Sequence, residues 1–125
     1  MDEETVGILE RGIALFNEEK YYEAHDVWED HWLNISGDER LFFQGLIQTA
    51  AAFYKLQLGN PRGMAKLLAD AVEALGGVSG RYGVDMAATR SFVSAWKQTA
   101  EEMVRSGRME HDSSPLPRLV YAPAR

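Results

Sequence analysis

The fold of this chain is decided by residues 38–58, which read DERLFFQGLIQTAAAFYKLQL. Apolar residues recur through this stretch at helical spacing and point to most sides of the helix, not to one stripe. A helix that is apolar nearly all round has to be covered by neighbouring elements. We therefore expect residues 38–58 to form the central helix of a bundle.

The sequence on both sides of this helix also has helical period. Apolar residues recur at intervals of three and four, and no run alternates like a half-buried strand. The pattern predicts an all-α fold of about five helices in antiparallel hairpins around the central one. The outer helices are expected over residues 3–19, 21–33, 61–75 and 86–106.

Capping residues mark several of the expected helix ends. They are Ser36 or Asp38, Gly59, Asn60, Asp85 and Gly107, with Pro61 at a first helical position. The helix over residues 61–75 is expected to turn one apolar face inward, made of Leu67, Leu68, Ala71, Val72 and Leu75.

The length of 125 residues fits one helical domain over residues 1–107 followed by a tail over residues 108–125. The tail contains three prolines and shows no helical pattern. Its stretch LPRLVYAP is apolar enough that we expect it to lie extended along the bundle.

The charge of the chain is unevenly distributed. Residues 1–40 carry twelve acids and three bases, whereas residues 41–125 carry seven acids and ten bases. Nucleic-acid binding requires clustered Lys and Arg, so no nucleic-acid partner is predicted. The acidic part is expected to face the rest of the chain or to present a surface to a partner.

Other features exclude several classes of protein. The chain has no cysteine, which removes disulfides, thiol catalysis and metal sites built on thiolates. The acidic start MDEETVG has no apolar signal core. The apolar stretch over residues 41–58 is too short and too polar to cross a membrane. We expect a cytoplasmic protein with no membrane partner and no cofactor.

Residues 21–32, YYEAHDVWEDHW, gather most of the residues that could carry chemistry. On a helical wheel they separate into three stripes. The first, Tyr21, Trp28 and Trp32, is aromatic and expected in the core. The second pairs His25 with Glu29 one turn later. The third is a solvated acidic face, made of Glu23, Asp26 and Asp30.

The central helix carries a matching polar stripe, in which Gln44, Gln48 and Lys55 recur at helical spacing. An unpaired buried polar group costs roughly 1–3 kcal/mol, so this stripe must meet water or polar partners. We expect it to face His25 and Glu29 in a polar seam between the second and third helices. The seam would be walled by aromatic residues, namely Trp28, Trp32 and Tyr54.

Two interpretations of the seam stay open. His25 and Glu29 could form a general base oriented by a carboxylate, or a buried structural pair. No confident metal site is predicted, because neither Glu-x-x-His nor His-x-x-x-His is present. The ligand-binding candidates are His25, Glu29, Gln44, Gln48, Tyr54 and Lys55. Arg62 and Lys66, at the start of a helix, are candidates for anion binding.

Three ordered motifs, EAHDVWE, QGLIQ and GNPRG, resemble the helical family known as domain of unknown function 309. The resemblance spans about residues 8–76 and implies a small domain of about five helices with no established activity. The positions that match the family pattern are Glu23, Ala24, His25, Glu29, Gln44, Gly45, Gln48, Gly59, Asn60 and Gly63. Lys55 stands where many relatives carry histidine, which disfavours a metal because lysine is not a usual ligand.

The leading hypothesis is a small binding or protein-interaction module that uses the seam to recognise a small polar ligand or a protein segment. The alternative is a metal-assisted or general-base hydrolytic enzyme using His25 and Glu29. A homo-oligomer is expected, because three tryptophans and a mostly apolar central helix leave much surface to cover.

Overall fold

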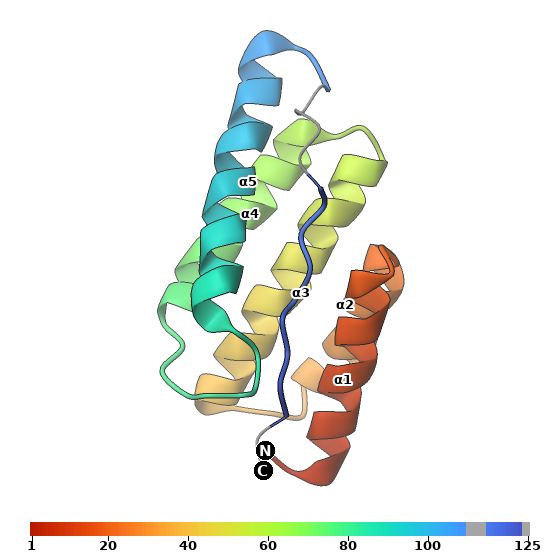
Figure 1. Ribbon diagram of the computed structural model, residues 1–125, viewed down its shortest axis with the longest axis vertical. Coiled ribbons are helices and arrows are strands. Elements are labelled where there is room, and N and C mark those ends of the chain that lie inside the picture. The colour runs from red at the N-terminus through yellow and green to blue at the C-terminus, as the bar shows by residue number, and fades with distance from the viewer. Residues whose placement is uncertain (110–114, 124–125) are drawn as a thin grey trace.

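The computed structural model describes residues 1–109 and 115–123 and is all-helical (Figure 1). No strand is present in these two ranges, and the predicted all-α class is confirmed. The five helices are α1 (Glu3–Asn17), α2 (Tyr21–Trp32), α3 (Gly37–Gln57), α4 (Pro61–Gly76) and α5 (Met86–Ser106).

Each helix packs mainly against the helices that precede and follow it in the chain, and short turns join the first four (Figure 1). α3 lies between α2 and α4 and contacts both extensively. Its fully buried side chains cover about half of the helix circumference, and Gln44 and Gln48 on the other half are partly exposed, so α3 is less completely covered than expected. The fully buried side chains are Phe42, Phe43, Leu46, Thr49, Ala50, Ala52 and Phe53.

Glycines let neighbouring helices approach closely at two points. A Cβ on Gly12 of α1 would lie 2.0 Å from the indole nitrogen of Trp28, so α2 packs its tryptophan directly on the α1 backbone. A Cβ on Gly45 of α3 would lie 2.4 Å from Cδ2 of Leu75 in α4. Both close approaches bring large apolar side chains into the space that a methyl group would occupy.

The helix ends follow the expected capping chemistry with one exception. The Asn60 and Asp85 side chains accept hydrogen bonds from the first turns of α4 and α5, and Gly107 ends α5 at a φ of 72°. At the start of α3, Ser36 occupies the N-cap position, but its side chain makes no capping bond. Asp38 does not cap α3 either, because its carboxylate binds the loop after α4.

The inward face of α4 differs from the prediction at one position. Val72 is 38% exposed, whereas Met64 is fully buried. The buried residues of α4 recur at intervals of three and four from Met64, and Val72 lies about 100° away from its buried neighbour Ala71. An apolar residue beside the inward stripe is therefore left at the surface.

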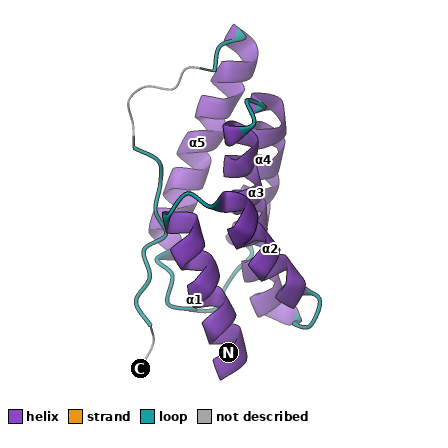
Figure 2. Ribbon diagram, turned by 90° about the vertical axis from the view of Figure 1, so that its right-hand side faces the viewer, coloured by secondary structure: helices purple, strands orange, loops and turns teal. Residues whose placement is uncertain are grey.

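The chain after α5 is described at residues 108–109 and 115–123; the other residues of the predicted tail, 110–114 and 124–125, lie outside the described residues. The segment over residues 115–123 runs beside α1 (Figures 1 and 2). Its Leu119 is only 3% exposed and belongs to the hydrophobic core. Among the described helices, none has the length and apolarity needed to cross a membrane.

Candidate functional site

The His25–Glu29 pair lies on the side of α2 that borders α3. The Nε2 atom of His25 lies 2.8 Å from a carboxylate oxygen of Glu29, one turn along the same helix. Glu29 is exposed and His25 is about half-buried. The other ring nitrogen of His25, Nδ1, is buried and has no hydrogen-bond partner in the described part of the chain.

Gln44 and Gln48 lie one turn apart on α3, and both are partly exposed. They line shallow depressions on both sides of the helix. The carbonyl oxygen of the Gln48 side chain, Oε1, is buried and finds no partner within residues 1–109 and 115–123. The glutamines therefore form a ridge on the outer surface of the bundle, where the sequence predicted a seam between two helices.

The depression on the α2 side, here called the α2–α3 groove, has a volume of about 390 Å³. It is lined by Glu29, Trp32, Leu33, Gln44, Ile47 and Gln48. Leu33 is 72% exposed at its edge. The groove thus combines apolar walls with acceptor oxygens from one carboxylate and two amides.

The depression on the α4 side, here called the α3–α4 groove, has a volume of about 480 Å³. Its residues are Leu41, Gln44, Gln48, Asp70, Glu73 and Ala74. Three acids therefore flank the glutamine ridge when both grooves are considered, and no basic side chain is among the described residues that line them.

Of the tryptophans predicted to wall the seam, one lies in the core and the other lines the α2–α3 groove. Trp28 is fully buried and its indole nitrogen points to the Leu9 carbonyl of α1, 3.4 Å away, so it does not line the groove. Trp32 does line it, with the guanidinium of Arg40 4.0 Å from the ring centre. Leu33 and Ile47 also line it and were not predicted. The sequence signal for them is helical spacing, because Leu33 follows Glu29 by four residues and Ile47 follows Gln44 by three.

The other residues predicted for the seam lie outside the α2–α3 groove, towards the start of α2. Tyr54 of α3 packs against Tyr22, with ring centres 5.2 Å apart, and Tyr22 lies 6.1 Å from the His25 ring. Lys55 is partly exposed on α3 and is not a lining residue of either groove. The structure thus brings Glu29, Gln44 and Gln48 together.

Arg62 and Lys66 are both exposed on α4. Arg62 lines a depression of about 390 Å³ beside the end of α5, and Lys66 is not among its lining residues. The backbone N–H of Gly63 already donates to the Asn60 side chain, so this helix end is occupied by its own cap.

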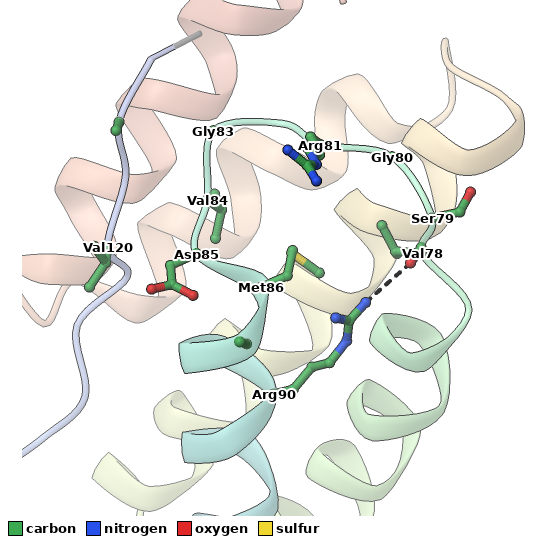
Figure 3. A pocket seen from close by; sticks show the side chains of 12 residues that line it. Val78, Ser79, Gly80, Arg81, Gly83, Val84, Asp85, Met86, Arg90 and Val120 are labelled. Atoms are coloured by element: carbon green, nitrogen blue, oxygen red, sulfur yellow. Dashed lines mark hydrogen bonds between the residues drawn. The ribbon is translucent and has the colours of Figure 1, made fainter.

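Another depression, of about 760 Å³, lies between the loop after α4, the start of α5 and the tail (Figure 3). Arg90 donates from its guanidinium to the carbonyl oxygens of Leu75 and Val78 at 2.9–3.1 Å. Asp85 caps α5 through the Ala88 N–H. Arg90 and Asp85 are thus engaged in contacts within the fold, and Arg81, the third charged residue of this lining, is exposed.

Two further polar clusters were missed by sequence reasoning. Buried His31 and Thr5 lie 2.8 Å apart, between Nε2 and Oγ1, and join α2 to α1. Asp38 accepts hydrogen bonds from Ser79, Gly80 and the Tyr82 hydroxyl. These bonds, led by that of Tyr82, lower the pKa of Asp38 to about 2. Both clusters connect distant segments, which helical spacing does not reveal.

Three or more His, Cys, Asp or Glu side chains do not gather into a possible metal site anywhere in the described ranges. The His25–Glu29 pair could exchange a proton. However, if Nε2 donates to Glu29, the basic nitrogen is the buried Nδ1, which a substrate in solvent does not reach.

A family model described as "Domain of unknown function (DUF309)" matches residues 9–67. The predicted resemblance to that family is therefore confirmed over a stretch from α1 into α4. The matched stretch contains all the motif residues between Glu23 and Gly63, and with them the glutamine ridge. No curated protein matches the chain.

Proposed function

We propose that the chain is a protein-interaction module that binds a basic segment of a partner protein across the glutamine ridge. The observation that carries the proposal is the pair of grooves on either side of the glutamine ridge, whose charged lining residues, Glu29, Asp70 and Glu73, are all acidic.

The chemistry of the grooves favours a lysine or arginine side chain as the anchor. Its aliphatic stem would pack on the apolar wall formed by Leu33 and Ile47. Its charged head would donate to the exposed carboxylate of Glu29. The excess of acids over bases in residues 1–40 would speed the approach of such a segment.

The experiment is a selection of peptides from a random displayed library on the folded chain. We expect enrichment of peptides in which Arg or Lys adjoins an aliphatic residue. Their binding should weaken as salt concentration rises. In an NMR titration, the side-chain amide signals of Gln44 and Gln48 should shift most.

Matched charge variants identify the site. Replacing both groove acids, by Glu29→Gln and Glu73→Gln, should weaken the selected peptides by at least about tenfold, since the loss of even one charged hydrogen bond, about 1.5–3 kcal/mol, corresponds to tenfold or more. Asp26→Asn with Asp30→Asn removes the same charge from exposed α2 positions outside both grooves and should have less than about a twofold effect. Equal losses in the two double variants, or enrichment of peptides without basic residues, would contradict the proposal.

A further inference from the structure

The C-terminal segment over residues 115–123 is held by backbone pairing of the kind that adds a strand to a sheet edge. The N–H of Asp85 donates to the carbonyl of Val120, and the N–H of Ala122 donates to the carbonyl of Gly83, both at 2.8 Å. Val84 and Tyr121 form an antiparallel bridge between these bonds. Such bonds recognise an extended backbone whatever its side chains.

A side chain at the end of α1 provides a second backbone clamp. The Asn17 amide donates to the carbonyl of Leu119 at 3.0 Å and accepts from the N–H of the same residue at 2.8 Å. The backbone carbonyl of Asn17 also accepts from Arg118 at 3.2 Å. Asn17 therefore pairs with Leu119 as a neighbouring strand would.

Side chains add selectivity to this backbone recognition. Leu119 points into the core and is 3% exposed, whereas Val120 is 56% exposed. The next residue, Tyr121, donates its hydroxyl to Glu10 of α1 at 3.0 Å. This alternation is that of a bound peptide with one apolar anchor and one polar contact. Glu10, Asn17 and residues 83–85 are here called the tail site.

The segment is also accessible on one side. Val120 and Ala122 line the depression of about 760 Å³ beside the loop, so the segment forms one of its walls (Figure 3). The Asn17–Leu119 contact joins residues 102 apart in the chain, and the segment belongs to neither helix that it contacts. It therefore behaves as a ligand of the helical bundle that happens to be covalently attached.

We infer that the tail site is a peptide-recognition site that also accepts residues 115–123 of a second copy of this chain. The occupant is specified by the structure, because the second copy presents the same backbone, leucine and tyrosine that already fit. The attached segment competes at a high effective concentration, so exchange between copies becomes visible when the internal contact is weakened. The inference is independent of the glutamine ridge and offers a route to a homo-oligomer.

The test mixes two full-length variants with complementary defects. Leu119→Asp spoils the segment and leaves the tail site intact. Gly83→Ala spoils the site and leaves the segment intact, because the new Cβ would lie 2.8 Å from the Tyr121 ring. Asn17→Ala is a second site variant. We expect each variant alone to be monomeric and the mixture to form a 1:1 heterodimer, measured by light scattering after size exclusion.

Controls separate this exchange from unspecific association. Val120→Asp changes an exposed position of a seated segment, so its mixture with Leu119→Asp should remain monomeric. Circular dichroism must show native helicity for each variant, and Leu119→Ser replaces Leu119→Asp if that variant is unfolded. A mixture of folded complementary variants that stays monomeric overturns the inference.

A synthetic peptide of residues 115–123 gives an independent readout. It should bind full-length Leu119→Asp at least about tenfold more tightly than it binds the unaltered chain, whose own segment competes. The same peptide carrying the Leu119→Asp change should not bind. Equal binding to the variant and to the unaltered chain would show that the peptide attaches elsewhere.

Discussion

Two glycines of α1 lie in opposite surroundings, and their replacement by alanine should have opposite effects. Gly7 is exposed, and no described atom beyond its own helix lies within 4 Å of the position of a Cβ. Gly7→Ala should therefore stabilise the chain by roughly 0.5–1 kcal/mol through helix propensity. Gly12→Ala should destabilise it by about 1–3 kcal/mol, because the methyl group would overlap the Trp28 indole.

Urea unfolding of the two variants and the unaltered chain measures both effects. Because both changes add the same methyl group to the same helix, their difference isolates the packing of Trp28. If Gly12→Ala were as stable as Gly7→Ala, the close contact between α1 and α2 would be wrong.

Tyr21 offers a prediction about a hydroxyl that the fold leaves unpaired. Its oxygen is buried with no partner among the described residues, and burial, helped by the nearby Glu19 charge, raises the pKa of Tyr21 to about 12. Tyr21→Phe should leave stability unchanged or raise it by up to about 1 kcal/mol, since no hydrogen bond is lost.

The raised pKa of Tyr21 also predicts how the stability of the chain changes at alkaline pH. The unfolded tyrosine ionises near pH 10 and the folded one near pH 12, so Tyr21 contributes a loss of stability as pH rises through this interval. Thermal unfolding between pH 9 and 12 should show this loss to be smaller in Tyr21→Phe. A variant that is markedly less stable at pH 7 would reveal a partner for the hydroxyl.

Some contacts of the candidate site could be predicted residue by residue and others could not. The His25–Glu29 contact follows from their separation of four residues, which places both on one side of a helix. The pairing of His31 with Thr5 spans 26 residues and depends on how α1 crosses α2. The outward position of Gln48 depends on a rotation of α3 about its axis, which a helix apolar on most sides does not specify.

At the scale of elements, Asp38 connects the start of α3 to the loop after α4 and makes that connection sensitive to acid. Hydrogen bonds from Tyr82 first, then from the Ser79 and Gly80 backbone, lower the pKa of Asp38 to about 2. Because the folded pKa is depressed, the carboxylate contributes stability above its unfolded pKa of about 4, and that contribution is lost as pH falls towards 2.

Asp38→Asn should therefore be less stable than the unaltered chain at pH 7, because an amide replaces one acceptor oxygen with a donor. The difference between the two chains should shrink as pH falls from about 4 to about 2 in thermal unfolding. Asp30→Asn, at an exposed position of α2, is the matched control and should show no such narrowing. A gap that stays constant down to pH 2 would mean that the Asp38 bonds do not form.

The helices themselves were predictable because their signals are local. The expected ranges agree with the observed helices to within about two residues, since caps such as Asn60, Asp85 and Gly107 act within one turn. The loop over residues 77–85 was not predictable beyond its glycines. Its path is set by Asp38 and Arg90, which reach it from other elements.

At the scale of the whole molecule, the packing of each helix against its chain neighbours keeps most contacts short in sequence. Such topologies favour fast folding, because little loop entropy is lost before contacts form. The tail site is a long-range exception, since it joins residues 17 and 119. The sequence predicted an apolar tail, but nothing in helical periodicity identified Asn17 as its partner.

The contrast between contacts of neighbouring helices and the long-range tail contact predicts that replacing a leucine in each place changes a different rate, that of folding or that of unfolding. Leu119→Ala should cost about 2 kcal/mol or more and should appear mainly as unfolding faster by roughly 30-fold, because the segment docks after the bundle has formed. Leu46→Ala, at a fully buried position of α3, should instead slow folding appreciably. Stopped-flow kinetics in urea separates the two rates. If Leu119→Ala slowed folding as much as Leu46→Ala, the segment would belong to the folding nucleus, and its description as an attached ligand of the bundle would be wrong.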